Sequence, residues 1–206
     1  KLNGTRGDDA IFGMYGNDII TDNYGNNYLD GGEGDDKITG RGVFVGGWGN
    51  DTLYAQQTGS ADTFIFNYGQ GRDTIYSQDN QKTEDKILFG QGISSDMVKH
   101  SKSGNNLILK IGSYDQITII NYFSGAQYQT INRFEFADGT VWQANGKTGT
   151  AFGYNVTTPA RAAMMSAQVN NLISAMASFA PEAAMASSLP ANQYDPNSVM
   201  LASSAA

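Results

Sequence analysis

The sequence contains no cysteine, a single histidine and few basic residues, and each shortage excludes a class of protein. Without cysteine there is neither a disulfide framework nor a thiolate metal site. No apolar run is long enough to cross a bilayer, and no N-terminal signal peptide is recognisable. Thirteen Lys and Arg against 20 Asp and Glu give a formal charge of -7. This acidic balance argues against nucleic acid as a partner and favours cations.

What the sequence has instead is an internal repeat. Gly31–Thr39 matches the nonapeptide G-G-x-G-x-D-x-U-x, in which U is a large apolar residue, and residues 46–54 match it again. Residues 4–12, 13–21 and 22–30 are weaker copies in the same phase. The sixth position is Asp9, Asp18, Asn27, Asp36 and Asp51, and the eighth is Ile11, Ile20, Leu29, Ile38 and Leu53. Because Lys1 already lies inside the array, we expect the chain to be a fragment of a longer protein.

The repeat predicts a coil that needs a cation. Glycines at positions one, two and four favour tight turns, and the last three residues have strand character. Stacked coils place the eighth-position side chains inside as an aliphatic ladder, which is too thin to offset the backbone entropy of so many glycines. The turns align carboxylates and carbonyls into all-oxygen cages that suit Ca²⁺. The candidate ligands are the side chains of Asp9, Asp18, Asn27, Asp36 and Asp51 and the turn residues Gly4, Gly7, Gly13, Gly16, Gly31, Gly32, Gly34, Gly46, Gly47 and Gly49.

These motifs resemble the RTX (repeats-in-toxin) family. The resemblance implies a parallel β-roll in which each nonapeptide makes half a coil and several Ca²⁺ ions lie between turns on the same side. One site would join Asp18 to Asp36 and another Asp9 to Asn27; a third would join Asn27 to Asp51 if the insertion at residues 40–45 bulges out of register. Asn27 is neutral and its turn opens with Asp22-Asn23, so we expect its sites to bind more weakly. The competing interpretation is a Gly/Asp-rich loop region that binds nothing.

The array becomes irregular after Asp51. Asp62 and Asp73 keep the D-x-apolar end of the motif and are predicted as further ligands. Alternating patterns then predict strands at residues 86–89, 107–111, 116–120, 131–136 and 141–142, with turns at 103–106 and 138–139. The segments 84–89, 106–107, 121–123 and 136–140 resemble the haemolysin-type flanking region, which implies a cap on the open end of the roll. Asp85 is either a last Ca²⁺ ligand or a surface turn carboxylate.

The C-terminal segment changes composition again. Thr158-Pro159 predicts the start of a helix, apolar residues follow at helical spacing until Pro181, and residues 187–206 are expected to be disordered. This arrangement resembles the C-terminal type I secretion signal of RTX toxins and adhesins; an ordinary tail is the alternative. The end of the chain lacks the acidic residue followed by bulky apolar residues that RTX proteases and lipases usually carry.

The predicted fold is all-β, with a β-roll at 1–76, a β cap at 77–148, and a helix with a disordered tail at 149–206. The predicted function is that of a calcium-binding C-terminal RTX module of a secreted bacterial toxin or adhesin. It would fold on Ca²⁺ outside the cell and use the type I secretion machinery as a partner, while any host-cell or surface ligand would belong to the upstream protein.

Two alternatives remain. One is an adhesive or carbohydrate-binding module rigidified by Ca²⁺, whose candidate face is Trp48, Tyr54, Tyr68 and Tyr76. The other is the non-catalytic tail of a secreted RTX hydrolase. No enzyme is expected in either case, because His100 has neither a cysteine nor an activated serine to work with.

Overall fold

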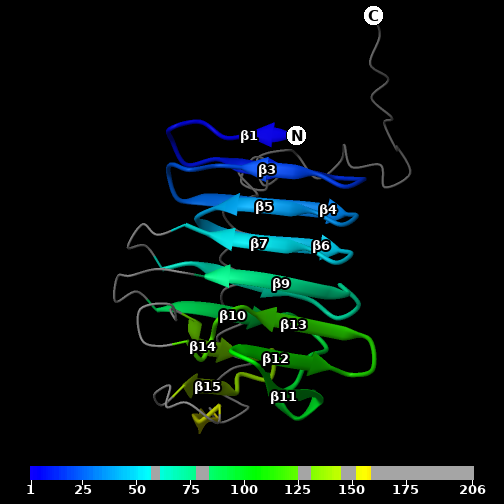
Figure 1. Cartoon of the computed structure of the whole chain (residues 1–206), viewed down its shortest axis with the longest axis vertical. Helices are drawn as coiled ribbons and strands as arrows, with labels where there is room; N and C mark the ends of the chain where they lie inside the picture. The colour runs from blue at the N-terminus through cyan, green and yellow to red at the C-terminus, as the bar shows by residue number, and fades with distance from the viewer. Residues whose placement is uncertain (57–60, 78–83, 125–130, 145–151, 159–206) are drawn as a thin grey trace, which may run out of the picture. The chain divides into compact units, whose positions relative to one another are not determined.

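The repeat region folds into short strands joined by tight turns. Residues 1–77 form β1 (Leu2–Asn3), β2 (Ala10–Phe12), β3 (Ile19–Thr21), β4 (Asn27–Glu33), β5 (Lys37–Gly40), β6 (Gly42–Trp48), β7 (Thr52–Ala55), β8 (Thr63–Phe66) and β9 (Arg72–Ser77). Odd-numbered strands pair in parallel in one sheet and even-numbered strands in a second, so each pair of strands completes one coil (Figure 1). We call this part of the chain the roll.

The following residues form a region that we call the cap. It comprises β10 (Asp85–Phe89), a 3-10 turn (Ser95–Met97), β11 (Val98–Ser103), β12 (Asn106–Ile111), β13 (Asp115–Ile119), β14 (Ile131–Glu135), β15 (Val141–Ala144) and β16 (Tyr154–Thr157). These strands continue both sheets of the roll. Sheet A has the order β1-β3-β5-β7-β9-β13-β12-β11, and sheet B the order β16-β15-β14-β10-β8-β6-β4-β2.

The computed structural model describes residues 1–56, 61–77, 84–124, 131–144 and 152–158, all of which belong to one compact unit of residues 1–161. These residues are all-β, as predicted. They contain no α-helix, and no helix among them is suited to cross a membrane. The helix and disordered tail predicted from residue 159 onward lie outside the described residues.

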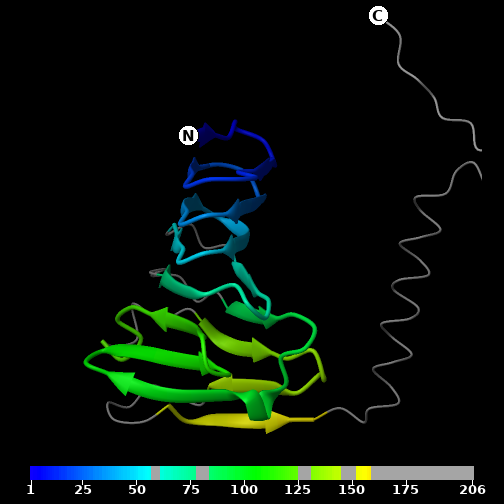
Figure 2. The same cartoon turned by 90° about the vertical axis from the view of Figure 1, so that its right-hand side faces the viewer.

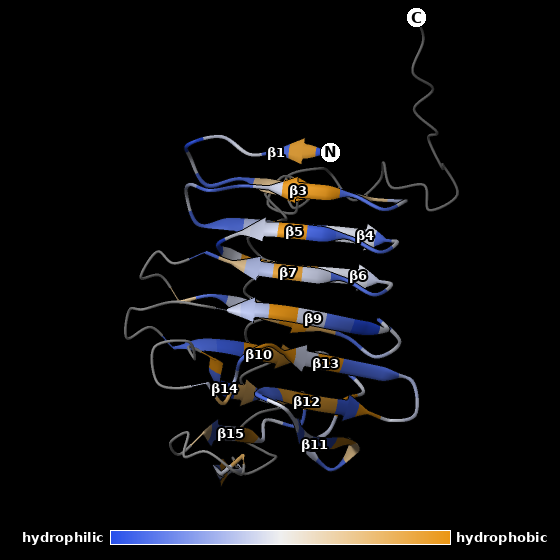
Figure 3. Ribbon diagram, viewed as in Figure 1, coloured by the Kyte–Doolittle hydropathy of each residue, from blue (hydrophilic) through white to orange (hydrophobic). Residues whose placement is uncertain are grey.

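Two facing ladders of apolar side chains form the core of the roll. In sheet A the register places Leu2, Ile20, Ile38, Leu53 and Ile75 beside one another. In sheet B it aligns Ile11, Leu29, Phe44, Phe64 and Ile87. The sheet A ladder appears as an apolar band along the middle of the stacked strands (Figure 3). The eighth-position residues therefore point inward as predicted: those of the first four copies alternate between the sheets, while Ile38 and Leu53, from the last two copies, both lie in sheet A.

The cap closes the roll by changing strand direction. β13 pairs in parallel with β9 and then antiparallel with β12, while β14 pairs in parallel with β10 and then antiparallel with β15. Figure 2 shows the coils of the roll stacked on these strands. The predicted strands at 86–89, 107–111, 116–120, 131–136 and 141–142 are confirmed, whereas β11 and β16 were not predicted.

Candidate metal sites at the turns of the roll

The two sheets are connected by two stacks of turns, one on each side of the roll. We call turns that lead from a strand of sheet A to sheet B the A-to-B turns, and those that lead back the B-to-A turns. Asp18, Asp36, Asp51 and Asp73 lie in the B-to-A turns or at the start of the strand that follows, and Asp9, Asn27, Asp62 and Asp85 lie likewise at the A-to-B turns. Every sixth-position residue of the array thus falls in one of two ladders.

In the B-to-A turns, each aspartate after Asp18 accepts a hydrogen bond from the turn before it. The backbone N–H of Asp18 donates to Oδ1 of Asp36 (2.6 Å), and the N–H of Asp36 donates to Oδ1 of Asp51 (2.7 Å). The N–H of Asp51 donates to Oδ1 of Asp73 (3.0 Å). One carboxylate oxygen of each acceptor is therefore committed to the backbone, and the second oxygen remains for another partner.

That second oxygen is buried in the middle of the ladder. Oδ2 of Asp36 and Oδ2 of Asp51 are shielded from solvent and have no hydrogen-bond partner, and the two residues are 2% and 1% exposed. Burial raises the pKa of Asp51 to about 7 and that of Asp73 to about 8, and the neighbouring carboxylates add to the effect. A row of buried anionic oxygens without donors is unfavourable unless a cation neutralises it.

The glycines bring backbone carbonyls to the same place. A Cβ on Gly31 would meet both Oδ2 of Asp36 and the carbonyl oxygen of Gly46, and a Cβ on Gly13 would meet the carbonyl of Gly31. Only glycine leaves room for these oxygens to converge. The described residues contain no group of three or more His, Cys, Asp or Glu side chains that could hold a metal. Any ion here would instead take one or two carboxylates together with carbonyl oxygens, a donor set that suits Ca²⁺.

The remaining predicted glycines lie in the turns of both stacks or at the strand ends beside them. Gly16, Gly32, Gly34, Gly47 and Gly49 have positive φ angles, between 94° and 145°, as the turn positions require. Successive turns stack backbone on backbone: the carbonyl oxygen of Gly32 lies against Gly47, and that of Gly34 against Gly49. Gly4 and Gly7 lie in the first A-to-B turn, where Gly4 faces the carboxylate of Asp22.

The A-to-B ladder is less regular. The N–H of Asp9 donates to Oδ1 of Asn27 (3.0 Å), and the N–H of Asp62 donates to Oδ1 of Asp85 (2.8 Å). Between them, the N–H of Gly42 donates to Oδ1 of Asp62 (2.6 Å), because the turn between β5 and β6 is short and has no aspartate. Asp85 is fully buried and belongs to this ladder, which excludes the alternative of a surface turn carboxylate.

The third predicted site, joining Asn27 to Asp51, is wrong. Residues 42–45 do not bulge but form the first half of β6, which pairs with residues 27–30 of β4. This arrangement buries Phe44 completely and satisfies the strand hydrogen bonds, which a bulge would leave open. Asp51 consequently lies in the B-to-A turns, 15 residues after its neighbour Asp36, on the opposite side of the roll from Asn27.

Two buried carboxylates were missed by the sequence analysis. Asp115 accepts the N–H groups of Gly69 (2.7 Å, on Oδ2) and Gly71 (3.1 Å, on Oδ1), and so links the turn before β9 to the cap, although the strand register pairs Ile117 rather than Asp115 with Asp73. Its sequence, Asp115-Gln116-Ile117, keeps the D-x-apolar pattern that could have identified it. The other is Asp22, which is 2% exposed and occupies the first position of its copy, where glycine is expected.

The predicted aromatic face is divided in the structure. Tyr54 and Tyr76 stack on sheet A with their ring centroids 4.4 Å apart, while Trp48 ends β6 of sheet B and is 63% exposed. Tyr68 lies beside Gly112 in the turn region next to the cap. These four residues therefore do not form a single binding face.

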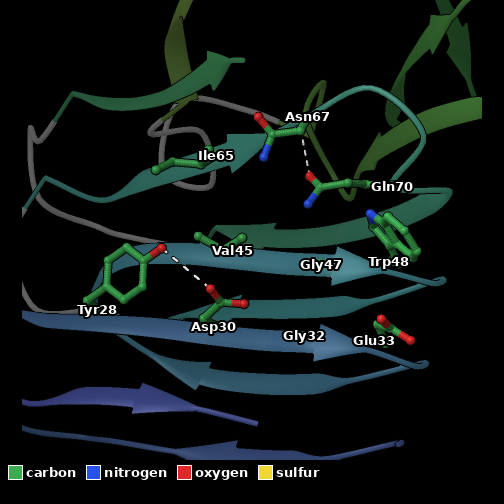
Figure 4. Close-up of a pocket in the computed structure, with 10 residues that line it drawn as sticks. All are labelled: Tyr28, Asp30, Gly32, Glu33, Val45, Gly47, Trp48, Ile65, Asn67 and Gln70. Atoms are coloured by element: carbon green, nitrogen blue, oxygen red, sulfur yellow. Dashed lines mark hydrogen bonds between the residues drawn. The ribbon is translucent and has the colours of Figure 1, made fainter. Parts of the chain in front are cut away.

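Sheet B instead carries a hollow of about 320 Å³ that includes Trp48 (Figure 4). Tyr28 and Trp48 lie at its two ends, and Asp30, Glu33 and Gln70 supply polar groups. A second hollow of about 220 Å³ shares the wall formed by Asp30, Gly32 and Glu33 and is lined by the exposed side chains of Phe12, Met14 and Tyr15.

Two family models match parts of the chain that have this geometry. Residues 3–38 and 43–57 match the RTX calcium-binding nonapeptide repeat, and residues 106–145 match the haemolysin-type calcium binding protein related domain. A search of curated proteins gives no match. The chain therefore carries calcium-binding RTX repeats followed by a haemolysin-type related domain, and such repeats are typical of secreted bacterial proteins.

Proposed function

We propose that this chain is the calcium-gated, C-terminal folding module of a secreted bacterial toxin or adhesin. One observation carries the proposal: the B-to-A turns align carboxylates whose second oxygens are buried and lack a donor. Such turns are unfavourable without a cation and favourable with one. Folding of the roll would therefore depend on the concentration of Ca²⁺.

The mechanism is mass action on the folded state. Bound Ca²⁺ would supply the positive charge that the carboxylates of Asp18, Asp36, Asp51 and Asp73 lack, and the glycine carbonyls between them would complete the donor set. For a dissociation constant on the order of 10⁻⁴ M, about 1 mM Ca²⁺ stabilises the folded state by about 1.4 kcal/mol per site, whereas sub-micromolar Ca²⁺ contributes almost nothing. Each aspartate in the ladder lies between two turns, so neighbouring sites share residues and the coils should fold cooperatively.

A circular dichroism titration with Ca²⁺ after chelation tests this proposal. We expect a sigmoidal coil-to-β transition between about 0.1 and about 1 mM. Asp18→Asn with Asp36→Asn removes two adjacent members of the ladder and should shift or abolish the transition. Asp96→Asn, which neutralises an exposed carboxylate outside both ladders, should leave it unchanged. A chain that is already folded in chelator and does not respond to Ca²⁺ contradicts the proposal.

We also propose that the C-terminal part of the predicted 149–206 segment carries the export signal, on the basis of its composition and its resemblance to type I secretion signals. The start of that segment, with Phe152 and β16, belongs to the cap instead. The chain would cross the channel unfolded at cytosolic Ca²⁺ and fold on reaching millimolar Ca²⁺ outside. Deletion of residues 160–206 should abolish export by a type I machinery while leaving the Ca²⁺ transition of the purified chain intact. Export of the deleted chain at the normal level would place the signal elsewhere.

The module would act without catalysis. The one histidine, His100, packs its ring edge-on against Phe152 (5.2 Å between centroids) and Tyr154 (5.5 Å), which gives it a structural role in the cap. His100→Phe should therefore preserve the biological activity of the parent protein, because the ring contacts are retained.

The hollows on sheet B favour a second candidate function, the binding of a carbohydrate. They combine exposed aromatic rings with carboxylate and amide groups, the usual composition of a small-molecule site. On this proposal Trp48→Ala weakens glycan binding in the presence of Ca²⁺, while Tyr54→Ala, on sheet A, has no effect. Equal glycan binding by the two variants argues against this function, and so does the absence of glycan binding by the unsubstituted chain.

A further inference from the structure

We propose that Asp22 is an additional cation ligand in the A-to-B turns, where it supplies the oxygen that Asn27 does not. The proposal rests on the proposed calcium-binding function and assigns a ligand at a position where the repeat pattern expects glycine. Among the described residues, three carboxylate oxygens are buried without a hydrogen-bond partner: Oδ2 of Asp36, Oδ2 of Asp51 and Oδ2 of Asp22. Asp36 and Asp51 are sixth-position residues of the repeat. Asp22 has the same kind of buried oxygen without a partner, but it stands at the first position of its copy.

The carboxylate of Asp22 occupies the place of a glycine carbonyl. In the B-to-A turns, a Cβ added to Gly13 would meet the carbonyl oxygen of Gly31. A Cβ added to Gly31 would in the same way meet the carbonyl oxygen of Gly46, the first glycine of the next turn. In the A-to-B turns, a Cβ on the equivalent residue Gly4 would meet the carboxylate of Asp22. A charged side-chain oxygen therefore points into the site where the regular turns place a neutral backbone oxygen.

Asn27 makes the backbone hydrogen bond of a sixth-position aspartate but lacks its second oxygen. Its Oδ1 accepts the N–H of Asp9 (3.0 Å), as the ladder requires. Its other terminal atom is an amide nitrogen, which donates to the carbonyl oxygen of Tyr24 (2.6 Å). Asn27 thus maintains the hydrogen-bond ladder but has no second oxygen to offer an ion.

Asp22 restores both the oxygen and the charge. Asp9 and Asp22 together bring two carboxylates to this turn pair, the same number that Asp18 and Asp36 bring to theirs. Oδ1 of Asp22 accepts the N–H of Tyr24 (3.3 Å), which holds the carboxylate in place and leaves Oδ2 free. We therefore expect the Asp9–Asn27 turn pair to bind Ca²⁺ about as well as its regular counterpart, in contrast to the weaker binding predicted from the sequence.

Arg41 defines the alternative explanation for Asp22. Its Nε is buried without a hydrogen-bond partner, and its positive charge acts on Asp22. If Arg41 were the counter-ion, Asp22 would stabilise the calcium-free chain and have no part in binding. The two roles predict different results in a binding experiment.

Isothermal titration of the full chain with Ca²⁺ distinguishes them. We expect Asp22→Asn to lose one bound ion, or to raise the dissociation constant of one site at least tenfold, with the other sites unchanged. Asn27→Asp in the Asp22→Asn background should restore that site, because it returns an oxygen and a charge from the sixth position. Asp22→Gly carries the residue of the regular copies and replaces Asp22→Asn if that variant does not fold.

Two outcomes contradict the inference, and a third contradicts the function beneath it. An unchanged number of ions with unchanged affinity in Asp22→Asn removes Asp22 from the site. The second outcome is that Asp22→Asn and Arg41→Gln lose the same stability in chelator and bind Ca²⁺ unchanged. Asp22 would then be the ion-pair partner of Arg41 and not a ligand. Failure of the unmodified chain to take up Ca²⁺ rejects the proposed function itself.

Discussion

Gly16 and Gly34 occupy the same position of their nonapeptides and both have positive φ angles, of 94° and 130°. They differ in what lies beside them. A Cβ on Gly16 would find no atom within 4 Å, whereas a Cβ on Gly34 would lie 2.5 Å from the carbonyl oxygen of Gly16 and 2.9 Å from Oδ1 of Asn17. The pair therefore separates backbone strain from the stacking of one turn on another.

We predict that Gly16→Ala costs about 1 kcal/mol, the usual cost of placing a side chain in a left-handed conformation. Gly34→Ala should cost about 2 kcal/mol more, because the turns would also have to move apart. Urea unfolding at saturating Ca²⁺ measures both free energies. Equal losses in the two variants would mean that the turns are not stacked as closely as the structure shows.

The buried aspartates predict an unusual pH dependence for the calcium-free chain. Burial raises the pKa of Asp51 from 3.8 to about 7 and that of Asp73 from 3.8 to about 8. The folded state then binds protons more tightly than the unfolded state. Its stabilisation by these groups is fully present below about pH 3.8 and is lost as the pH rises through about 7 and 8.

The calcium-free chain should accordingly gain β structure as the pH falls from about 8.5 to about 5, in the absence of any metal. Far-UV circular dichroism of protein freed of Ca²⁺ by a chelating resin measures this gain. Asp51→Asn with Asp73→Asn removes both titrating groups and should flatten the response. A spectrum that does not change over this range, in the unsubstituted chain, contradicts the prediction.

At the scale of the elements, the repeat phase predicted the coil but could not predict where the coil shortens. Regular coils are 18 residues long, as between Asp18 and Asp36, while the coil that ends at Asp51 has 15. The segment 42–45 has no sixth-position aspartate, so nothing in the motif predicted that it is a strand. Its position in sheet B is explained by the burial of Phe44. Asp22 was overlooked for a related reason, since at the first position of the motif it looked like a defect.

Phe44 tests the assignment of that segment to β6. Its side chain is fully buried and stacks on Phe64 with ring centroids 5.0 Å apart. Phe44→Ala should destabilise the calcium-bound chain by about 3–5 kcal/mol. Val43→Ala, at the neighbouring half-buried position, should cost about 1 kcal/mol or less, as measured by urea unfolding. Similar losses of stability in the two variants would mean that residues 42–45 bulge out of the sheet, as the sequence predicted.

At the scale of the whole described unit, the roll and the cap differ in what holds them together. Each coil of the roll turns only one or two apolar side chains per sheet inward and places carboxylates at its turns. The cap buries a dense aromatic cluster that includes Phe134, Phe136 and Trp142, and its hairpins bring strands together locally. The sequence showed this contrast as a change from glycine turns to alternating strands, although the cap strands β11 and β16 lacked a pattern strong enough to predict them.

This difference predicts that the two regions respond separately to Ca²⁺. In chelator the cap should retain its core, since apolar burial does not require an ion, while the roll loses its structure because its carboxylates repel. Hydrogen exchange measured by mass spectrometry should then show full exchange of residues 1–56 and protection of residues 106–119. Addition of Ca²⁺ should extend protection from β8 and β9, which pair with the cap strands β10 and β13, toward β1 and β2. The prediction also means that the cap acts as a template on which the coils assemble. Protection of both regions at the same Ca²⁺ concentration would contradict it, because the roll and the cap would then fold as a single cooperative unit.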